Sequence, residues 1–279
     1  MNGFLLHLSA PMQSWGEHSA FTDRDSAAHP TRSGLIGMIA AALGITRADA
    51  VTDPVDGMVT HFGRLSRLRF TIRHDRIGTR MRDYHTVGGG YPPHRTAPTA
   101  SGGRRKAGQG TIVSHRHYLA DAAFTVAVTA PTDVDLLPEC VQALETPRWP
   151  LHLGRRSCPP GALLVLGRDR PNPVADLLRL PLARPKPRSA KKDTEVTVKF
   201  TSDAPFGSDI PPTESSRAAV TTLNDEPVRL KPQDRVYRSR PSYTTSCTLP
   251  VDLCGGYGID YLQAIDAYFN PSTPERTEP

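Results

Sequence analysis

The chain has few cysteines, and none of them is paired in the sequence. Its 279 residues include four cysteines without a Cys-x-x-Cys arrangement, and no histidine lies close to Cys247 and Cys254. A structural zinc site needs ligand pairs two to four residues apart. We therefore expect free, partly buried thiols, no metal site and no cofactor.

Familiar catalytic signatures and long apolar segments are also absent. No P-loop, Gly-x-Ser-x-Gly or His-Glu-x-x-His pattern occurs, so nucleotide hydrolysis, serine hydrolase and zincin chemistry lack their usual support. The N-terminal apolar run, residues 3–8, is short and has no charged region before it, unlike a signal peptide. The most apolar helix candidate, residues 35–43, falls short of the about 20 residues that span a bilayer. We expect a cytoplasmic protein with no membrane partner.

Proline and glycine, in contrast, are abundant. The chain has 27 prolines and 22 glycines at a hydrophobic content of only 38%. This composition indicates long irregular stretches around a compact centre. The length allows one large domain, or one domain with appendages.

Positive charge is concentrated in one segment. Residues 61–120 contain twelve Lys and Arg against two acidic residues, a net charge of +10, whereas the whole chain is only +6. The same segment holds six of the ten histidines. A phosphate-rich partner would select such a segment. The alternative is a solvated loop whose charge only keeps the protein soluble.

The order of predicted elements indicates the fold class. Alternating apolar residues predict strands at 3–9, 64–73 and 123–130, with the arginines of 64–73 on the exposed face. Helices are expected at 33–43 and 133–145, and further extended segments at 149–153 and 161–166. This β-α-β-β-α-β order is that of an α+β, ferredoxin-like core, shared by RNA-recognition motifs.

Two departures from a minimal core are expected. A thumb insertion, residues 78–118, separates the second and third strands and coincides with the basic segment. Loops that long are usually functional or disordered. We divide the chain into a core, residues 1–183, and an irregular C-terminal extension, 184–279. In the extension we expect a strand at 195–201, a loop at 203–212 and a loop with short extended pieces at 224–240. A short helix is expected at 257–269, and a frayed, disordered tail from 271.

The first candidate binding residues follow the first strand. Trp15 can stack on unpaired bases, and Arg24 and Arg32 can pair with phosphate. The helix beginning near Ser33 offers free backbone N–H groups. The alternative is that Trp15 packs in the core while Ser33 only caps the helix.

A second group lies in the insertion, where basic and aromatic residues interleave. Single-stranded nucleic acid is held in this way, by phosphate contacts and stacking. If the insertion is a hairpin, Tyr84 and His85 come near His115 and His117, a cluster that would also suit a metal-free ribonuclease. Histidine pairs on a strand are more often ordinary surface or ligand-contacting residues. The candidates of this group are Arg80, Arg82, Tyr84, His85, Arg104, Arg105, Lys106, Arg116 and His117.

A third, weaker candidate is the turn containing Arg155 and Arg156. A Gly-Arg-Arg turn at the end of an extended segment suits phosphate or an acidic protein surface.

Together these blocks resemble the CasD-type subunits of the type I-E CRISPR surveillance complex, Cascade. The resemblance depends on the order and spacing of the segments, weakens after Arg170 and returns at 223–228. The matching positions are residues 8–16, Phe21, Thr22, Arg24, Asp25, Pro30, Thr31, Ser33, Gly34, Gly37 and residues 40–44, 83–90, 116–122 and 153–158.

The resemblance implies a non-catalytic subunit that holds the repeat-derived 5′ handle of the CRISPR guide RNA. It implies contacts with the Cascade backbone subunit through the thumb and with the large PAM-reading subunit alongside, and with target DNA only through the complex. Residues 84, 85 and 88–90 would begin the thumb, and Arg116, His117, Arg155 and Arg156 would add handle or neighbour contacts. The residues that would line the handle pocket are Gln13, Ser14, Trp15, Arg24, Arg32 and Ser33.

Two parts of the chain depart from the family pattern: residues 92–108 of the thumb are long, and the chain beyond Arg184 is extended. Two alternatives also stay open. One is a metal-independent endoribonuclease that processes CRISPR precursor RNA, as CasD-like proteins of the I-C subtype are thought to do. The other is a general RNA-binding module outside CRISPR.

Overall fold

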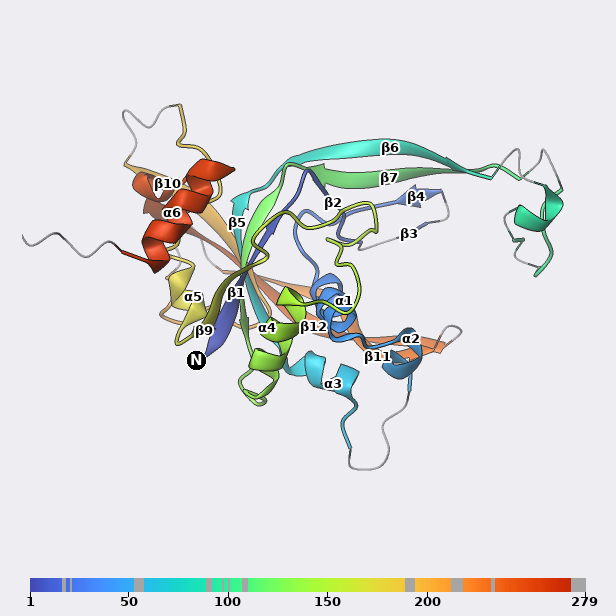
Figure 1. The fold of residues 1–279 in the computed structure, drawn as a ribbon, viewed down its shortest axis with the longest axis horizontal. Helices are drawn as coiled ribbons and strands as arrows, with labels where there is room; N and C mark the ends of the chain where they lie inside the picture. Colours follow the sequence, from blue (N-terminus) through green and yellow to red (C-terminus); the bar gives the residue numbers. More distant parts are fainter. Residues whose placement is uncertain are drawn as a thin grey trace, which may run out of the picture.

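A seven-stranded antiparallel sheet forms the centre of the molecule (Figure 1). The computed structural model describes residues 1–16, 19–20, 22–52, 58–88, 92–96, 98–99, 101–106, 110–188, 194–211, 218–231 and 234–271. The strand order of this main sheet is β11-β12-β10-β5-β8-β1-β9. A smaller sheet has the order β2-β7-β4-β3, with β6 paired to β7. The fold is therefore mixed α/β with antiparallel sheets. The order of predicted elements indicated this mixture of helices and strands.

Strand alternation divides the apolar residues between the two faces of the main sheet. On one face, Phe4, Leu6 and Leu8 of β1 pack with helices α1 and α4. Leu5 faces the other way, into a second core that includes residues of α6. The elements involved are β1 (Gly3–Ser9), α1 (Arg32–Leu43), β5 (Arg69–Arg76), β8 (Ala123–Thr129), α4 (Leu136–Glu145), β9 (Val165–Arg170), α5 (Pro173–Asp176) and α6 (Ile259–Phe269).

Helix α1 begins and ends where its capping residues indicate. The side chain of Thr31 accepts a hydrogen bond from the Gly34 amide, and Gly44 ends the helix in the left-handed conformation. The remaining helices are α2 (Arg47–Ala50), α3 (His61–Arg64) and the single turns η1 (Leu65–Arg67), η2 (Pro93–Arg95) and η3 (Val251–Leu253). No helix among the described residues is long and apolar enough to cross a membrane.

The strand predicted at 64–73 begins later than expected, so the first part of that prediction is wrong. Thr60 caps α3, and η1 follows, so strand β5 starts only at Arg69. Arg64 and Arg67 both bond the carboxylate of Asp133, at 2.9 and 3.0 Å, which favours the helical course. The segment expected to be extended at 149–153 is irregular, and β9 starts later than the apolar run 161–166.

The arginines of β5 are not all exposed, contrary to the prediction. Arg73 and Asp75 are both fully buried and are paired at 2.6 Å. Arg73 also donates to the carbonyl oxygens of Leu177, Leu180 and Pro181 at 2.6–2.7 Å. Because a buried charge is costly unless it is fully paired, this network fixes the chain after α5 against the sheet.

Two buried histidines are held neutral. Burial lowers the pKa of His7 to about 4. Burial also lowers the pKa of His74 to about 3, and the nearby His29 and Lys199 lower it further. The ring of His74 instead hydrogen-bonds the hydroxyl of Thr201 at 3.0 Å.

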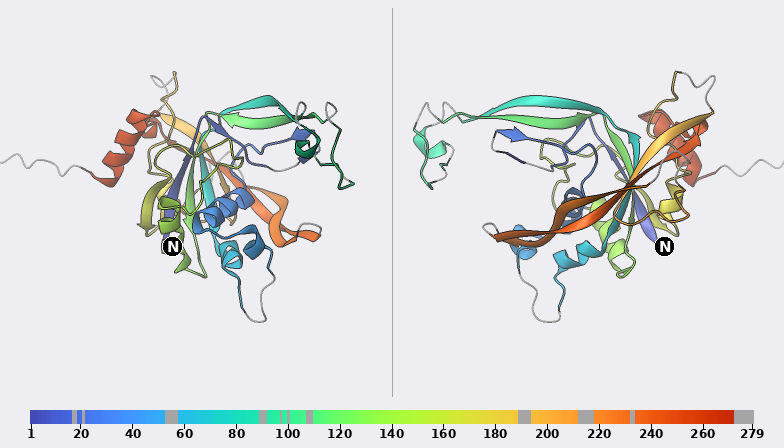
Figure 2. Two further views of the ribbon diagram at one scale, coloured as in Figure 1. Left: turned by 45° about the vertical axis from the view of Figure 1, so that its right-hand side comes forward. Right: turned by 180° about the vertical axis from the view of Figure 1, so that it is seen from behind.

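The C-terminal part of the chain extends the same sheet. Strand β10 (Glu195–Ser202) pairs with β5, and β12 (Asp234–Pro250) joins β10 to β11 (Ala219–Lys231). The loop with short extended pieces expected at 224–240 is therefore wrong, because residues 224–231 and 234–240 belong to two long paired strands that Figure 2 shows projecting from the sheet. The division of the chain at residue 184 stays a prediction. The expected tail lies, from residue 272, outside the described residues.

Candidate functional site

A long hairpin, here called the arm, carries most of the candidate residues. Strands β6 (Thr79–Val87) and β7 (Ile112–Ala120) continue β5 and β8, which are neighbours in the main sheet. Figures 1 and 2 show the arm projecting far beyond that sheet, with η2 at its tip. The short strands β2 (Met12–Gln13), β3 (Ser19–Ala20) and β4 (Asp23–Arg24) accompany its base.

The bend between sheet and arm depends on one glycine and one arginine. Gly78 has a φ of +71°, and a Cβ there would lie 2.5 Å from the carbonyl oxygen of Ala120. Across the bend, Arg76 donates to the carbonyl oxygen and the carboxylate of Asp121 at 2.6 and 2.8 Å, and to the carbonyl oxygen of Ala183 at 2.8 Å. The side chain of Arg76 thus helps to fasten the base of the arm to the core.

The register of the arm divides its side chains between two faces. Directly opposite residues of an antiparallel pair share a face, and successive residues alternate. Arg82 pairs with His117 and Tyr84 with His115, so these four share one side, here called the Tyr84 face. Asp83 pairs with Arg116 and His85 with Ser114 on the other side, here called the His85 face.

Part of the Tyr84 face is already neutralised by acidic residues near β4. Arg80 forms an ion pair with Asp25. His117 lies 3.2 Å from the carboxylate of Asp23, and Arg80 approaches its other ring nitrogen at 3.4 Å. Both aspartates flank Arg24 in the sequence, but neither was among the candidate binding residues.

The outer part of the Tyr84 face is open. Tyr84 is 64% exposed, and its ring centroid lies 5.6 Å from that of His115. Arg82 is exposed and makes no ion pair with any residue that the structure describes. An unpaired cation beside an exposed aromatic ring is the combination that binds a phosphate and a stacked base.

The predicted cluster of Tyr84, His85, His115 and His117 forms only in part. Tyr84 meets His115, as expected of a hairpin, but His85 lies on the opposite face, 3.6 Å from Asp83. The register therefore separates His85 from His117, and these two histidines do not form the acid–base pair that a ribonuclease of this kind requires.

The candidates that directly follow β1 are buried, and their side chains are bonded within the fold. Gln13, Ser14 and Trp15 are at most 1% exposed. The amide of Gln13 donates to the carbonyl oxygens of Leu8 and Ala122 at 3.0 and 2.8 Å and accepts from the Trp15 indole at 3.0 Å. The Ser14 hydroxyl donates to the His117 carbonyl oxygen at 3.1 Å. These side chains hold β1, β7 and the start of β8 together.

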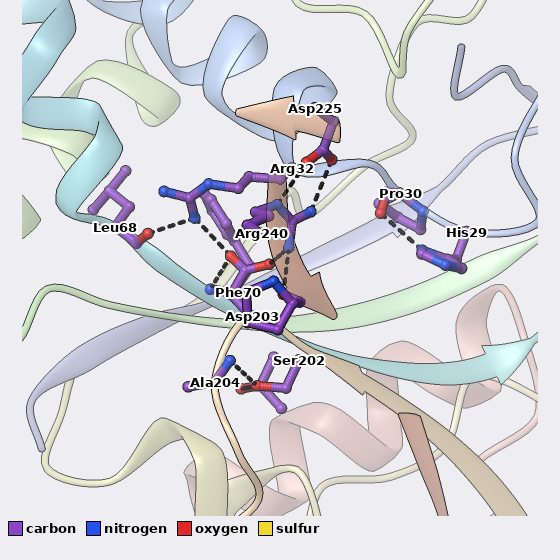
Figure 3. A network of polar contacts seen from close by, with 12 residues as sticks. His29, Pro30, Arg32, Leu68, Phe70, Ser202, Asp203, Ala204, Asp225 and Arg240 are labelled. Carbon is purple, nitrogen blue, oxygen red and sulfur yellow. Dashed lines mark hydrogen bonds and ion pairs between the residues drawn. The ribbon is translucent and has the colours of Figure 1, made fainter. Parts of the chain in front are cut away.

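The side chain of Arg32 is also bonded within the fold. It is 6% exposed, forms an ion pair with Asp203 at 2.6 Å and donates to the carbonyl oxygen of Leu68 at 2.7 Å. Asp203 in turn accepts from Arg240 of β12 at 2.8 Å, and Arg240 pairs with Asp225 of β11 (Figure 3). The network therefore anchors the C-terminal hairpin to the start of α1.

Ser33 is exposed on the first turn of α1, but the helix is capped by Thr31. Arg24, also exposed, lies in β4 beside Arg116 of β7. Arg116 is half-buried on the His85 face and donates to the Ser114 hydroxyl at 3.3 Å.

The Gly-Arg-Arg turn packs against the base of the arm. Gly154 has a φ of +90°, and a Cβ there would lie 1.6 Å from the carbonyl oxygen of Ser14. Arg155 stacks over Tyr118 at 5.0 Å and donates to the carbonyl oxygen of Arg24 at 2.8 Å. Arg155 is therefore used within the fold, whereas Arg156 beside it is exposed.

At the tip, three consecutive cations face solvent. Arg104, Arg105 and Lys106 are all exposed. The tip is held by the buried Thr96, whose hydroxyl donates to the Arg105 carbonyl oxygen at 2.7 Å, while Arg104 donates to the Thr96 carbonyl oxygen at 2.9 Å. Within the described residues, no group of three His, Cys, Asp or Glu side chains could hold a metal ion.

Comparisons with known proteins give a consistent result. The sequence model of the family described as CRISPR-associated protein (Cas_Cas5) matches residues 3–242. "CRISPR system Cascade subunit CasD" of Escherichia coli (strain K12) is 36% identical over 165 residues, which are 58% of this chain and 69% of that protein.

Two solved structures are also similar. A chain of a "CRISPR RNA-guided surveillance complex" superposes with a TM-score of 0.77 at 41% identity, over 95% of this chain and 98% of that one. A "Crystal structure of Cas protein" matches with a TM-score of 0.53 at 24% identity, over 92% and 99% of the two chains, a likeness of fold alone.

Proposed function

The chain belongs to the CRISPR-associated Cas5 family, and from this premise we propose that it is the CasD-type, guide-RNA-binding subunit of a cytoplasmic Cascade surveillance complex. In this role it holds the 5′ handle of the guide RNA and connects the backbone subunit to the large PAM-reading subunit. It meets target DNA only through the assembled complex.

The observation that carries the proposal is the open part of the Tyr84 face. There Arg82, which forms no ion pair with the described residues, shares a face of the arm with Tyr84, whose ring contacts that of His115. The three cations at the tip extend the positive surface outward. Phosphate contacts along a strand combined with aromatic stacking are the usual means of holding single-stranded RNA.

The proposed architecture is a ferredoxin-like core with a thumb. The order β5-β8-β1-β9 with α1 and α4 on one face supports such a core, and the arm corresponds to the thumb insertion, residues 78–118. Arg24, Ser33 and Arg156 are exposed and remain candidates for handle contacts.

The proposed role is non-catalytic. The two histidines of the endoribonuclease alternative, His85 and His117, lie on opposite faces of the arm, and His117 is already engaged by Asp23 and Arg80. These arrangements favour binding over general acid–base chemistry.

The proposal is tested by incubating the purified protein with repeat RNA in EDTA. We expect tighter binding of RNA that carries the repeat-derived 5′ handle than of scrambled RNA of equal length, and no cleavage. Equal affinity for both would favour a general RNA-binding module. Cutting at the handle boundary that is abolished in His85→Ala or His117→Ala would establish the endoribonuclease alternative instead.

A further inference from the structure

Helix α6 presents apolar side chains to solvent on the part of the molecule remote from the arm's tip (Figures 1 and 2). Ile259 is 73% exposed, Leu262 is 41% exposed, and Tyr257, just before the helix, is 60% exposed. These three residues are here called the α6 patch. A surface helix normally turns polar residues outward, and contiguous exposed apolar residues on a soluble protein mark an interaction surface.

The inner side of α6 is firmly packed, so the patch is presented rigidly. Tyr261 and Ile265 are 3% and 4% exposed within the second core. The ring of Tyr261 lies 4.7 Å from that of His7 in β1. Tyr257 is held as well, because the guanidinium of Arg76 lies 5.5 Å from its ring centroid. Binding at this surface would therefore cost little side-chain and backbone entropy.

The charges carried by helix α6 itself are opposite to those of the arm, while Arg76 lies against Tyr257 and Lys186 pairs with Asp252 nearby. Residues 251–270 include three aspartates and neither lysine nor arginine, in a chain of net charge +6. Asp260 and Asp266 are exposed on the helix beside the patch. The exposed carboxylates of Asp260 and Asp266 repel the phosphates of RNA and attract cationic side chains, while the apolar residues require apolar contact.

We propose that the α6 patch is a docking surface for a protein subunit of the complex, one that offers apolar side chains flanked by Lys or Arg. The inference rests on the proposed membership in a multisubunit complex, but not on the RNA site of the arm. The patch also lies beyond residue 242, where the match to the family's sequence model ends. The arm would then hold RNA while α6, remote from the arm's tip, holds protein.

The test uses the full chain, guide RNA carrying the handle, and the protein subunits encoded with this chain, each purified. The variant Ile259→Asp with Leu262→Asp places charges in the patch at exposed positions. We expect one protein subunit to bind at least tenfold more weakly and to be missing from the assembled complex, as measured by native mass spectrometry. Guide-RNA affinity should stay within twofold of the unmodified chain.

Two further variants sharpen the result. Val134→Asp, at a residue 52% exposed next to α4, is the matched control and should assemble normally. Asp260→Lys with Asp266→Lys should weaken the binding of the same subunit without adding charge to the apolar centre. Raised salt should also weaken the interface of the unmodified chain. Unchanged thermal unfolding midpoints would show that each variant is folded.

Several outcomes would overturn the proposal. The Ile259→Asp, Leu262→Asp variant could assemble fully at normal affinity, or its affinity for RNA could fall. The unmodified chain could also bind no protein subunit. Conversion of a homodimer of this chain to monomer would assign the patch to a second copy instead. Failure of the proposed function is distinct, because it appears as equal affinity of the unmodified chain for handle and scrambled RNA.

Discussion

The two-faced arm predicts that Tyr84→Ala weakens RNA binding while His85→Ala, one residue further along, does not. Tyr84 is 64% exposed on the Tyr84 face, and His115 lies against its ring. Because His115 contacts one side of the Tyr84 ring, the other side can stack a single base. His85 is on the opposite face beside Asp83.

The magnitude follows from the stacking of one base on the Tyr84 ring. Such stacking on an aromatic side chain is worth about 1–3 kcal/mol by alanine substitution. Since each 1.4 kcal/mol is about tenfold in affinity, Tyr84→Ala should weaken binding roughly 5- to 150-fold. Arg82→Ala removes one phosphate interaction and should reduce the slope of log affinity against log salt by about 0.7.

The assay is fluorescence anisotropy with handle RNA at several salt concentrations. Tyr84→Phe keeps the ring and should restore most of the affinity, which separates stacking from hydrogen bonding by the hydroxyl. His85→Ala should stay within twofold of the unmodified protein. Equal reductions in affinity for Tyr84→Ala and His85→Ala, or no reduction for Tyr84→Ala, would refute the assignment of RNA to this face.

Three further predictions concern stability. Asp203→Ala leaves two largely buried arginines without their shared carboxylate and should destabilise the fold by about 3 kcal/mol in urea unfolding; a destabilisation under about 1 kcal/mol would contradict the network's role. Because the folded-state pKa values of His7 and His74 are about 4 and about 3, the unfolded chain binds more protons below pH 6.5. Stability should then fall with decreasing pH by up to about 1.4 kcal/mol per unit for each histidine, and equal stability at pH 7 and pH 5 would argue against it. Gly154→Ala should cost about 1–2 kcal/mol for the left-handed backbone alone and reduce RNA affinity by displacing the adjoining turn, whereas unchanged melting would contradict the close approach.

The apolar alternation of the strands was enough to predict much of the core. Phe4, Leu6 and Leu8 lie on one face as expected, and helix α1 begins and ends within a residue of its expected limits. These features depend on local periodicity and capping, which sequence alone contains.

The buried polar residues could not be predicted in the same way. From the sequence alone, Arg32 and Arg73 look like exposed or phosphate-binding residues. In the structure, Arg32 pairs with Asp203, 171 residues further along the chain. Arg73 bonds carbonyl groups more than 100 residues away. The side-chain amide of Gln13 donates its hydrogen bonds to the backbone carbonyl oxygens of Leu8 and Ala122, on both sides of the arm's base. Such assignments require the tertiary structure, because local sequence does not identify distant partners.

The C-terminal hairpin was missed for a related reason. Asp225, Pro227 and other turn-forming residues interrupt the alternation expected of strands, and the register of β11 on β12 shifts on both sides of them. In the structure these irregularities are bulges in a continuous hairpin, which the pairing with β12 maintains.

The most direct test of the central claim is ultraviolet cross-linking of the assembled protein to guide RNA, with the cross-linked peptides identified by mass spectrometry. Nucleotides of the 5′ handle should cross-link to peptides containing Tyr84 and His115, and not to α6. Handle cross-links confined to α6 or to the C-terminal hairpin, with none on the arm, would contradict it.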